Sequence, residues 1–186
     1  MADESRYYRT LYEMARTINS SLDSVHVLEK ITSEVTRAMG AKASSIRLLG
    51  RRRQRLLLGA AYGLSRGYLR KGPIEVAKSG IDNEVIETKK PVITNTCAVS
   101  QLQYPEEAAR EGIKSIVVVP LTVEGQVIGV LRVYDEECRE YAPHEVDFLQ
   151  AVADLSAIAI ENARLHEALK KDYELLAAYE SRLFED

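Results

Sequence analysis

The sequence predicts one domain of the mixed α/β (α+β) class, and three observations carry this prediction. Two amphipathic helical segments precede a predicted hairpin at residues 43–62. A strongly apolar hairpin at residues 115–134 precedes one long helix, and a glycine-containing stretch at residues 63–112 separates the two hairpins. Strands and helices in this mixture fit one layered domain. A chain of 186 residues suits one domain with extra helices rather than two full domains.

The first two helices are predicted by apolar residues that recur at helical spacing. Such residues form one stripe from residue 7 to residue 18 and a second stripe from residue 25 to residue 39. Gly40 fits the left-handed conformation that ends many helices. We therefore expect a helical pair at the start of the domain.

The first hairpin is predicted from two strands, at residues 43–49 and 55–62, which are joined by a polar turn that contains three consecutive arginines. A phosphate-binding role for this basic turn stays open, but a solvated turn is the plainer interpretation. Residues 63–80 hold four glycines and predict a loop with one short strand at residues 74–77.

Short elements are expected between the loop and the second hairpin. Residues 81–88 predict a short helix, and residues 91–94 predict a strand at the edge of the sheet because it begins with proline. Pro105 predicts the start of another short helix, which ends near Gly112.

The second hairpin predicts a sheet that is covered on both faces. Residues 116–119 are Ile-Val-Val-Val, a run too continuously apolar for a strand with one exposed face. Residues 63–112 are the only material left to form the second cover, so we expect them to lie over the sheet.

The last helix is predicted to begin at Pro143 and to run without glycine or proline to the end of the chain. Its first half has apolar and small residues suited to packing on a sheet. Beyond it, leucines recur every seven residues, which is the pattern of a weak coiled-coil seam. We expect contact between two chains there, although a solvated or frayed tail is the alternative. The residues expected at this interface, including the stripe of the first helix, are Leu11, Met14, Ile18, Leu169, Leu176 and Leu183.

Composition excludes several classes of function. The formal net charge of -3 argues against a general nucleic-acid binder, whose domains are usually basic. The N-terminus lacks the features of a secretory signal, and no apolar run approaches the ~18 residues of a membrane span. Two cysteines make no disulfide framework, and the three scattered histidines give no metal-ligand spacing. We therefore expect a cytoplasmic protein with no metal, membrane or nucleic-acid partner.

The order of these elements and the sequences of several segments resemble the GAF domain family. Residues 112–121 read GIKSIVVVPL and residues 125–131 read GQVIGVL, which is similar to the central signature of that family. Three further segments are similar to the family, and they are residues 60–65, residues 79–93 and residues 154–165. The resemblance covers roughly residues 10–168 in all.

The resemblance implies a central antiparallel sheet with a helical layer on one face and a loop and short-helix layer that forms a pocket on the other. It also implies a sensory or regulatory module that binds a small molecule and pairs through its terminal helices. The expected division is an N-terminal helix at residues 1–20 that makes a dimer contact, a GAF domain at residues 21–166, and a coiled-coil-like helical extension at residues 167–186.

The ligands that the family is known to take do not match residues here. One branch reduces free methionine sulfoxide with cysteines, but Cys97 lies outside the expected positions and acidic neighbours raise the thiol pKa of Cys138. The cyclic-nucleotide motif is absent, and neither the bilin nor the haem histidine has a counterpart. We therefore expect no catalytic residue and no cofactor.

Arg132 is the leading candidate for a ligand contact, because a guanidinium inside an apolar strand is costly unless it is paired or solvated. An exposed or ion-paired arginine is the alternative. Residues 128, 130, 132 and 134 are expected to share one face of the last strand. The other candidate pocket residues are Tyr134, Arg47, Tyr62, Cys97, Tyr104 and Ser115.

Three functions follow, in decreasing order of support. The first is a non-catalytic GAF-type module that binds an unidentified small molecule, forms a homodimer and transmits through its terminal helices in signalling or transcription control. The second is a structural dimerisation domain without a ligand. The third is a thiol enzyme that reduces free methionine sulfoxide.

Overall fold

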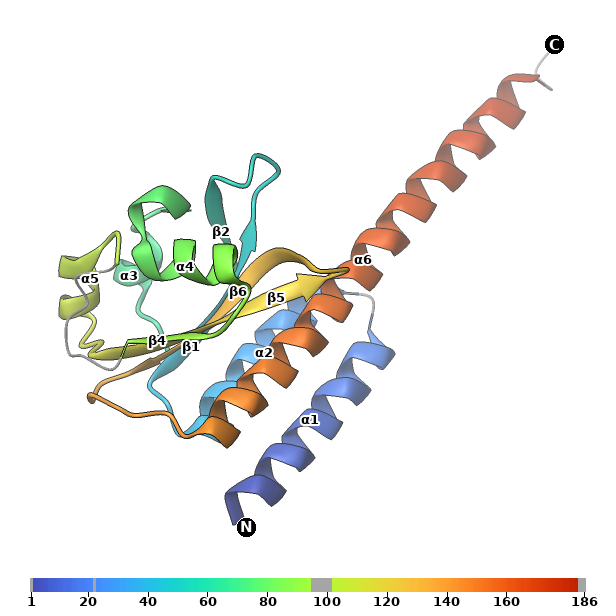
Figure 1. Cartoon of the computed structure of the whole chain (residues 1–186). Coiled ribbons are helices and arrows are strands. Elements are labelled where there is room, and N and C mark those ends of the chain that lie inside the picture. Colours follow the sequence, from blue (N-terminus) through green and yellow to red (C-terminus); the bar gives the residue numbers. More distant parts are fainter. Residues whose placement is uncertain (1, 22, 95–101, 184–186) are drawn as a thin grey trace.

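A computed structural model describes residues 2–21, 23–94 and 102–183, and a six-stranded antiparallel sheet lies at its centre (Figure 1). The strand order is β3-β2-β1-β6-β5-β4, so both predicted hairpins are adjacent pairs and the proline-initiated strand lies at an edge, as predicted. The strands are β1 (Ala43–Leu49), β2 (Arg55–Tyr62), β3 (Ile74–Glu75), β4 (Val92–Thr94), β5 (Ser115–Val123) and β6 (Gln126–Asp135).

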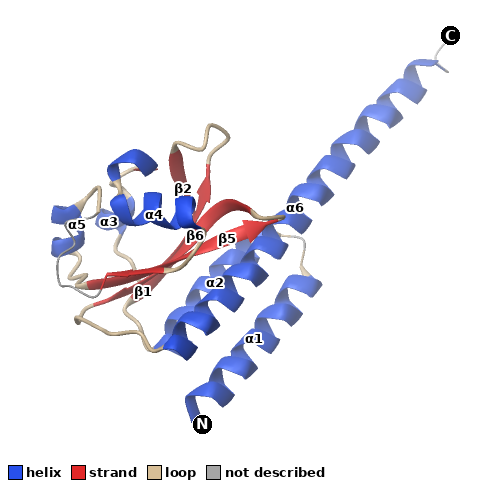
Figure 2. Ribbon diagram, in the orientation of Figure 1, coloured by secondary structure: helices blue, strands red, loops and turns tan. Residues whose placement is uncertain are grey.

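Three helices form the layer on one face of the sheet, where the second and the last contact the strands and the first packs against these two helices (Figure 2). They are α1 (Ala2–Ser20), α2 (Ser24–Met39) and α6 (Pro143–Leu183). The Asp23 carboxylate accepts hydrogen bonds from the backbone of Val25 and His26 and so caps the start of α2. Gly40 ends this helix at φ 59°, which confirms the predicted left-handed stop.

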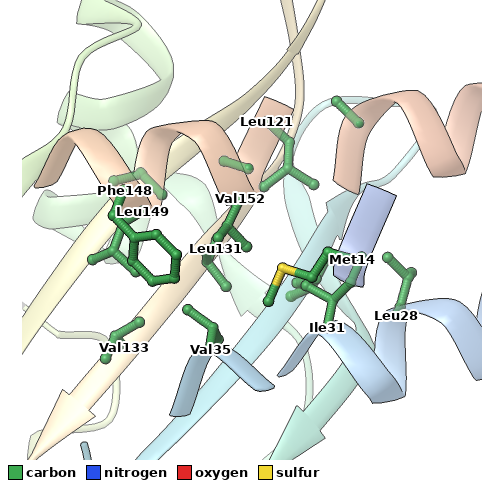
Figure 3. Packing of buried hydrophobic residues seen from close by; sticks show 14 of the residues in the cluster. Met14, Leu28, Ile31, Val35, Leu121, Leu131, Val133, Phe148, Leu149 and Val152 are labelled. Atoms are coloured by element: carbon green, nitrogen blue, oxygen red, sulfur yellow. The ribbon is translucent and has the colours of Figure 1, made fainter. Parts of the chain in front are cut away.

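The core under these helices is almost entirely aliphatic (Figure 3). Leu131 and Val133 rise from β6 against Leu149 and Val152 of α6, and Val35 of α2 joins them. The stripe of α1 inserts at the edge of the same cluster, where the Tyr7 ring stacks on Phe148 with ring centroids 4.3 Å apart. This core holds the helical layer to the sheet.

The segment between the hairpins covers the other face of the sheet, as predicted (Figure 1). Its elements are α3 (Arg66–Leu69), the 3₁₀ turn η1 (Val76–Lys78), α4 (Gly80–Thr88) and α5 (Pro105–Arg110). The predicted loop at residues 63–80 also contains one helical turn that the sequence did not predict, α3. The Ser65 side chain caps this helix by accepting a 3.1 Å hydrogen bond from the backbone of Tyr68, which offsets the helix-weakening effect of Gly67.

Two irregularities in pairing change which residues share a face. The β1–β2 register shifts between Ile46 and Arg47, and the β5–β6 register shifts between Leu121 and Thr122. Because of the second shift, Ile128 packs against the helix-side core while Val130 lies on the opposite face. The expectation that residue 128 shares a face with residues 130, 132 and 134 is therefore wrong.

The helix α6 is longer than the domain that it covers (Figure 1). It has 41 residues and is therefore about 60 Å long. The half that starts at Pro143 packs on the sheet, whereas every side chain described from residue 164 to residue 177 is exposed. The second half therefore has no partner within the described part of the chain.

The central strand pair depends on the absence of a side chain at Gly129. A Cβ atom at this position would lie 2.4 Å from the carbonyl oxygen of Arg47 on the neighbouring strand. We expect Gly129→Ala to lower the free energy of unfolding by about 2–3 kcal/mol, because β1 and β6 must separate to admit the methyl group. Urea unfolding followed by circular dichroism measures this effect.

Gly67→Ala is the matched control. A Cβ atom there meets only Ser65 Oγ at 3.7 Å, which is an ordinary contact. This variant should unfold at the same urea concentration as the parent or at a slightly higher one. Equal losses in the two variants would show that close strand approach is not the cause.

Candidate functional site

A buried ion pair lies at the centre of the face covered by α3 and α4. Arg132 of β6 donates from Nε to Asp82 Oδ1 of α4 at 3.0 Å, and its Nη2 contacts the second carboxylate oxygen. Ser79 Oγ donates to Asp82 Oδ2 at 2.5 Å. The side chains of Arg132 and Asp82 are 1% and 0% exposed, so water does not share in this bidentate pair.

The pair explains how an arginine is tolerated in an apolar strand. Burial opposes the charge of Arg132, but the attraction of Asp82 and their hydrogen bond outweigh burial, so the pKa of Arg132 is raised. The alternative of an ion-paired arginine is therefore realised in this structure. The pair fixes α4 against the sheet at one defined position.

Two tyrosines extend the polar arrangement. Tyr134 lies two residues after Arg132 on the same face of β6, is fully buried, and shares a 2.9 Å hydrogen bond with Ser45 Oγ of β1. Its ring meets the edge of Tyr68 from α3, with centroids 6.1 Å apart. The hydroxyl of Tyr68 is buried and has no hydrogen-bond partner among the described residues.

Arg47 is the second arginine on this face. It lies on β1, between the sheet positions of Leu58 and Val130, and is 1% exposed. Its Nε and Nη2 atoms are buried, and within residues 2–21, 23–94 and 102–183 neither has a hydrogen-bond acceptor. A buried guanidinium without a partner is unfavourable, so this residue needs a further explanation.

Lys71 closes the arrangement from the turn after α3. Its Nζ lies 3.2 Å from the centroid of the Tyr68 ring and 5.4 Å from that of Tyr104. Burial, followed by the charges of Arg132 and Arg47, lowers the pKa of Lys71 from its usual 10.5 to about 6. We call the following residues the buried polar cluster: Ser45, Arg47, Tyr68, Lys71, Asp82, Arg132 and Tyr134.

The structure brings some of the expected pocket residues together and separates others. Arg132, Arg47 and Tyr134 belong to the cluster, and Tyr104 lies beside it with its hydroxyl donating to the Pro73 carbonyl at 3.2 Å. The remaining three are described next.

Tyr62 and Ser115 point away from this cluster. The Tyr62 ring lies 5.4 Å from the guanidinium carbon of Arg37 on α2, so it is on the helical side of the sheet. Ser115 Oγ donates to the carbonyl of Glu137 at 2.8 Å, in the loop that follows β6. Cys97 lies outside the described residues.

The residues expected at a dimer interface fall into two groups. Met14 and Ile18 are buried in the core of their own chain, and Leu11 is half-buried against it. Leu169 and Leu176 are 69% and 67% exposed on the extension of α6. Leu183 ends α6, and its side chain is outside the described set.

Asp82, Ser79, Tyr68 and Lys71 were not among the sequence candidates. A charge count could have pointed to Asp82: two arginines in central strands require at least one buried carboxylate, and Asp82 lies in the first turn of a short helix of the covering layer. Nothing in the local sequence distinguishes Tyr68 or Lys71 from other loop residues.

Other chemistry finds little support in the described part of the chain. Cys138 is disulfide-bonded, so the treatment of this residue as a free thiol is wrong. No group of three or more potential metal ligands occurs among the described residues. None of the helices in residues 2–21, 23–94 and 102–183 is long and apolar enough to cross a membrane.

Comparison with known proteins gives one family. The family model described as GAF domain matches residues 21–161, which is more than half of the chain. No curated protein matches the sequence.

Solved structures resemble the fold at low sequence identity. The GAF domain of a phosphoenolpyruvate-protein phosphotransferase from Coxiella burnetii has a TM-score of 0.77 at 19% identity, covering 88% of this chain and 98% of that one. Free methionine-R-sulfoxide reductase from Neisseria meningitidis, in complex with its substrate, has a TM-score of 0.72 at 19% identity, covering 86% and 91%. Residues 122 to 287 of a methyl-accepting chemotaxis protein give 0.71 at 23% identity, covering 83% and 99%. At these identities the likeness shows the fold.

The ion pair makes a direct prediction. Asp82→Ala leaves the Arg132 guanidinium buried without a partner, so we expect the free energy of unfolding to fall by about 3–5 kcal/mol. The double variant Asp82→Leu with Arg132→Met removes both charges and should recover most of that loss. Urea unfolding of the three proteins measures the effect.

Glu106→Ala is the control for loss of a carboxylate. It breaks an ion pair with Arg110 whose side chains are 80% and 74% exposed, so we expect a change below about 0.5 kcal/mol. A double variant no more stable than Asp82→Ala would contradict the role given to the pair.

Proposed function

Because the chain belongs to the GAF domain family, we propose that it is a non-catalytic, cytoplasmic sensory or regulatory module that binds a small molecule. In this proposal residues 21–166 form the sensing domain. Residues 1–20 make a dimer contact, and residues 167–186 extend the last helix toward whatever it regulates. The chemotaxis protein and the phosphotransferase among the structural relatives support a regulatory setting.

One observation carries the binding role, namely the difference between the two faces of the sheet. The helix-side core is mostly aliphatic, with Tyr7, Tyr141 and Phe148 among its members, and the polar side chains buried beside it include hydroxyls such as those of Ser44 and Thr36. The opposite face buries two arginines, two tyrosines and an aspartate among apolar walls, which is the composition of a ligand site. Burying so many polar groups costs stability, and recognition of a ligand is a function that offsets this cost.

The proposed transmission follows the short chain segment that joins β6 to α6. Arg132 and Tyr134 of the buried polar cluster lie on β6, whose last residue, Asp135, accepts a 2.7 Å hydrogen bond from Tyr141 and pairs with Arg139. Arg139 also pairs with Glu145 in the first turn of α6. A ligand that favours one arrangement of β6 therefore acts on the start of α6 through this loop, provided that it binds the two arrangements with different affinity.

A structural dimerisation domain is the second candidate, and the exposed apolar residues of the long helix favour it. The second half of α6 exposes Leu165, Leu169, Tyr173, Leu175 and Leu176. The first helix exposes Tyr8 and Tyr12, although its Met14 and Ile18 already pack within the chain. Dimerisation is compatible with sensing, so the two candidates differ only in whether a ligand binds.

Native mass spectrometry of protein purified from its own source tests the binding role. We expect an adduct of constant small-molecule mass that disappears when the same sample is measured under denaturing conditions. The bare mass of the chain in every preparation, and no change in melting temperature with any fraction of a metabolite extract, would leave only the structural candidate.

Light scattering tests the proposed helical contact. We expect a dimer, and we expect Leu169→Glu with Leu176→Glu to shift it toward monomer, because a charge in a heptad seam opposes pairing. Ala168→Glu adds the same charge next to the seam, and this variant should leave the dimer intact. If the parent protein is monomeric at about 100 μM, the dissociation constant of the dimer is too high to support the proposal.

A further inference from the structure

The charges of the buried polar cluster do not balance. Its carboxylate is Asp82, and its guanidinium groups are Arg132 and Arg47. Asp82 offers two oxygens, and both are occupied by Arg132, with Ser79 adding a further hydrogen bond. Neither Nε nor Nη2 of Arg47 makes a hydrogen bond to Asp82. Two nitrogens of Arg47 remain buried without an acceptor among the described residues.

One more buried donor shares this lack of an acceptor, and the half-buried Lys71 lies beside it. Burial and the neighbouring Tyr134 raise the pKa of Tyr68, so its hydroxyl keeps its proton, and that hydroxyl is also buried without a partner in the described chain. Lys71 lies over the Tyr68 ring rather than beside a carboxylate. The charge of Arg47 acts on both Tyr68 and Lys71, which places the three side chains in one electrostatic neighbourhood.

We propose that Arg47, Tyr68 and Lys71 bind an oxyanion, the carboxylate or phosphate group of a small metabolite. This proposal rests on the proposed sensory function and specifies the chemistry of its ligand. A planar guanidinium binds two oxygens of a carboxylate or phosphate side by side, and the phenol and ammonium donate to the remaining lone pairs. Such a group offers acceptors to Nε and Nη2 of Arg47 and to the Tyr68 hydroxyl.

The surroundings limit the rest of the ligand. The walls on this side are aliphatic, with Ile81 and Val85 of α4 facing Val118 and Val130 of the sheet. A hollow of about 210 Å³ reaches Tyr68 from outside, and Glu107, Arg110 and Glu111 line it. The aliphatic walls match a molecule whose body is apolar and which carries one anionic group.

Binding must be linked to a proton. The pKa of Lys71 is about 6 in the unliganded protein, so at pH 7 this side chain is mostly neutral. A bound anion favours the charged form and raises that pKa, so the complex takes up a proton at Lys71. The groups that act on Lys71 are Arg132 and Arg47 of the sheet, Glu107 of α5 and Asp82 of α4, while the rings of Tyr68 and Tyr104 lie beside its Nζ.

Isothermal titration and thermal unfolding of the whole chain test the proposal, with sodium phosphate and sodium succinate as probes and sodium chloride at equal ionic strength as the reference. We expect saturable binding of at least one probe. Arg47→Met should weaken that binding about tenfold or more, since a hydrogen-bonded charge is lost. Without a probe, this variant should melt at the parent's temperature or higher, because an unpaired buried charge is gone.

Two controls separate the site from general charge effects. Arg37→Met removes the same charge from an exposed side chain on the other face of the sheet and should bind the probe as the parent does. Lys71→Met should bind without proton uptake, which titration in two buffers of different ionisation enthalpy measures. This second variant keeps the test decisive if Arg47→Met fails to fold.

The outcomes distinguish the sources of the anion. Saturation with phosphate alone indicates a phosphorylated metabolite, and saturation with succinate alone indicates an organic acid. The oxyanion proposal would be overturned if phosphate and succinate gave the same heats and melting temperatures as chloride. It would also be overturned if both Arg47→Met and Lys71→Met bound the probe as tightly as the parent and with the same proton uptake. If native mass spectrometry then showed a retained neutral molecule, the proposed sensory function would stand and only the oxyanion proposal would fail.

Discussion

The ion pair between Arg132 and Asp82 is the interaction on which the second face of the sheet depends. It joins residues 50 positions apart in the sequence, one on a central strand and one on a covering helix. Each charge alone would be too costly to bury, so neither side chain can occupy this place unless the other is present. The distance between α4 and the sheet is therefore set by a bidentate contact rather than by the adaptable packing of aliphatic side chains.

The same pair determines what else the cluster can do. Asp82 pairs with Arg132 and Ser79, while Nε and Nη2 of Arg47 are left without an acceptor in the described chain. Burial, together with the charges of Arg132 and Arg47, lowers the pKa of Lys71. A fully neutralised interior would have been more stable and would have had nothing to offer an anion. The imbalance is the physical basis for assigning this face to recognition and the helix-side face to stability.

The two faces are connected by the chain itself. β6 contributes Arg132 and Tyr134 to one face and Leu131 and Val133 to the other, so any displacement of this strand is felt in both layers. Its end is tied through Arg139 to the first turn of α6. Because α6 continues beyond the domain with exposed side chains, this rigid helix can carry a small displacement at the buried polar cluster away from the domain.

The sequence by itself determined the main helices and strands, their order and the two-sided cover of the sheet. These follow from local causes: apolar spacing for α1, α2 and α6, the left-handed position for Gly40, and the continuous apolar run at residues 116–119 that only a buried strand can hold. It also singled out Arg132 and Arg47, because a charge within an apolar strand is visible without coordinates.

Only the tertiary structure decided which groups meet. The partnership of Arg132 with Asp82 depends on how α4 docks, and the placement of Tyr62 on the helical side depends on strand register, which shifts at one point of β1. The stripe of Met14 and Ile18 could have faced a second chain as well as its own, because an amphipathic pattern states that a face is buried and not by what. Local sequence specifies the surfaces to be buried, while partner choice is a property of the folded chain as a whole.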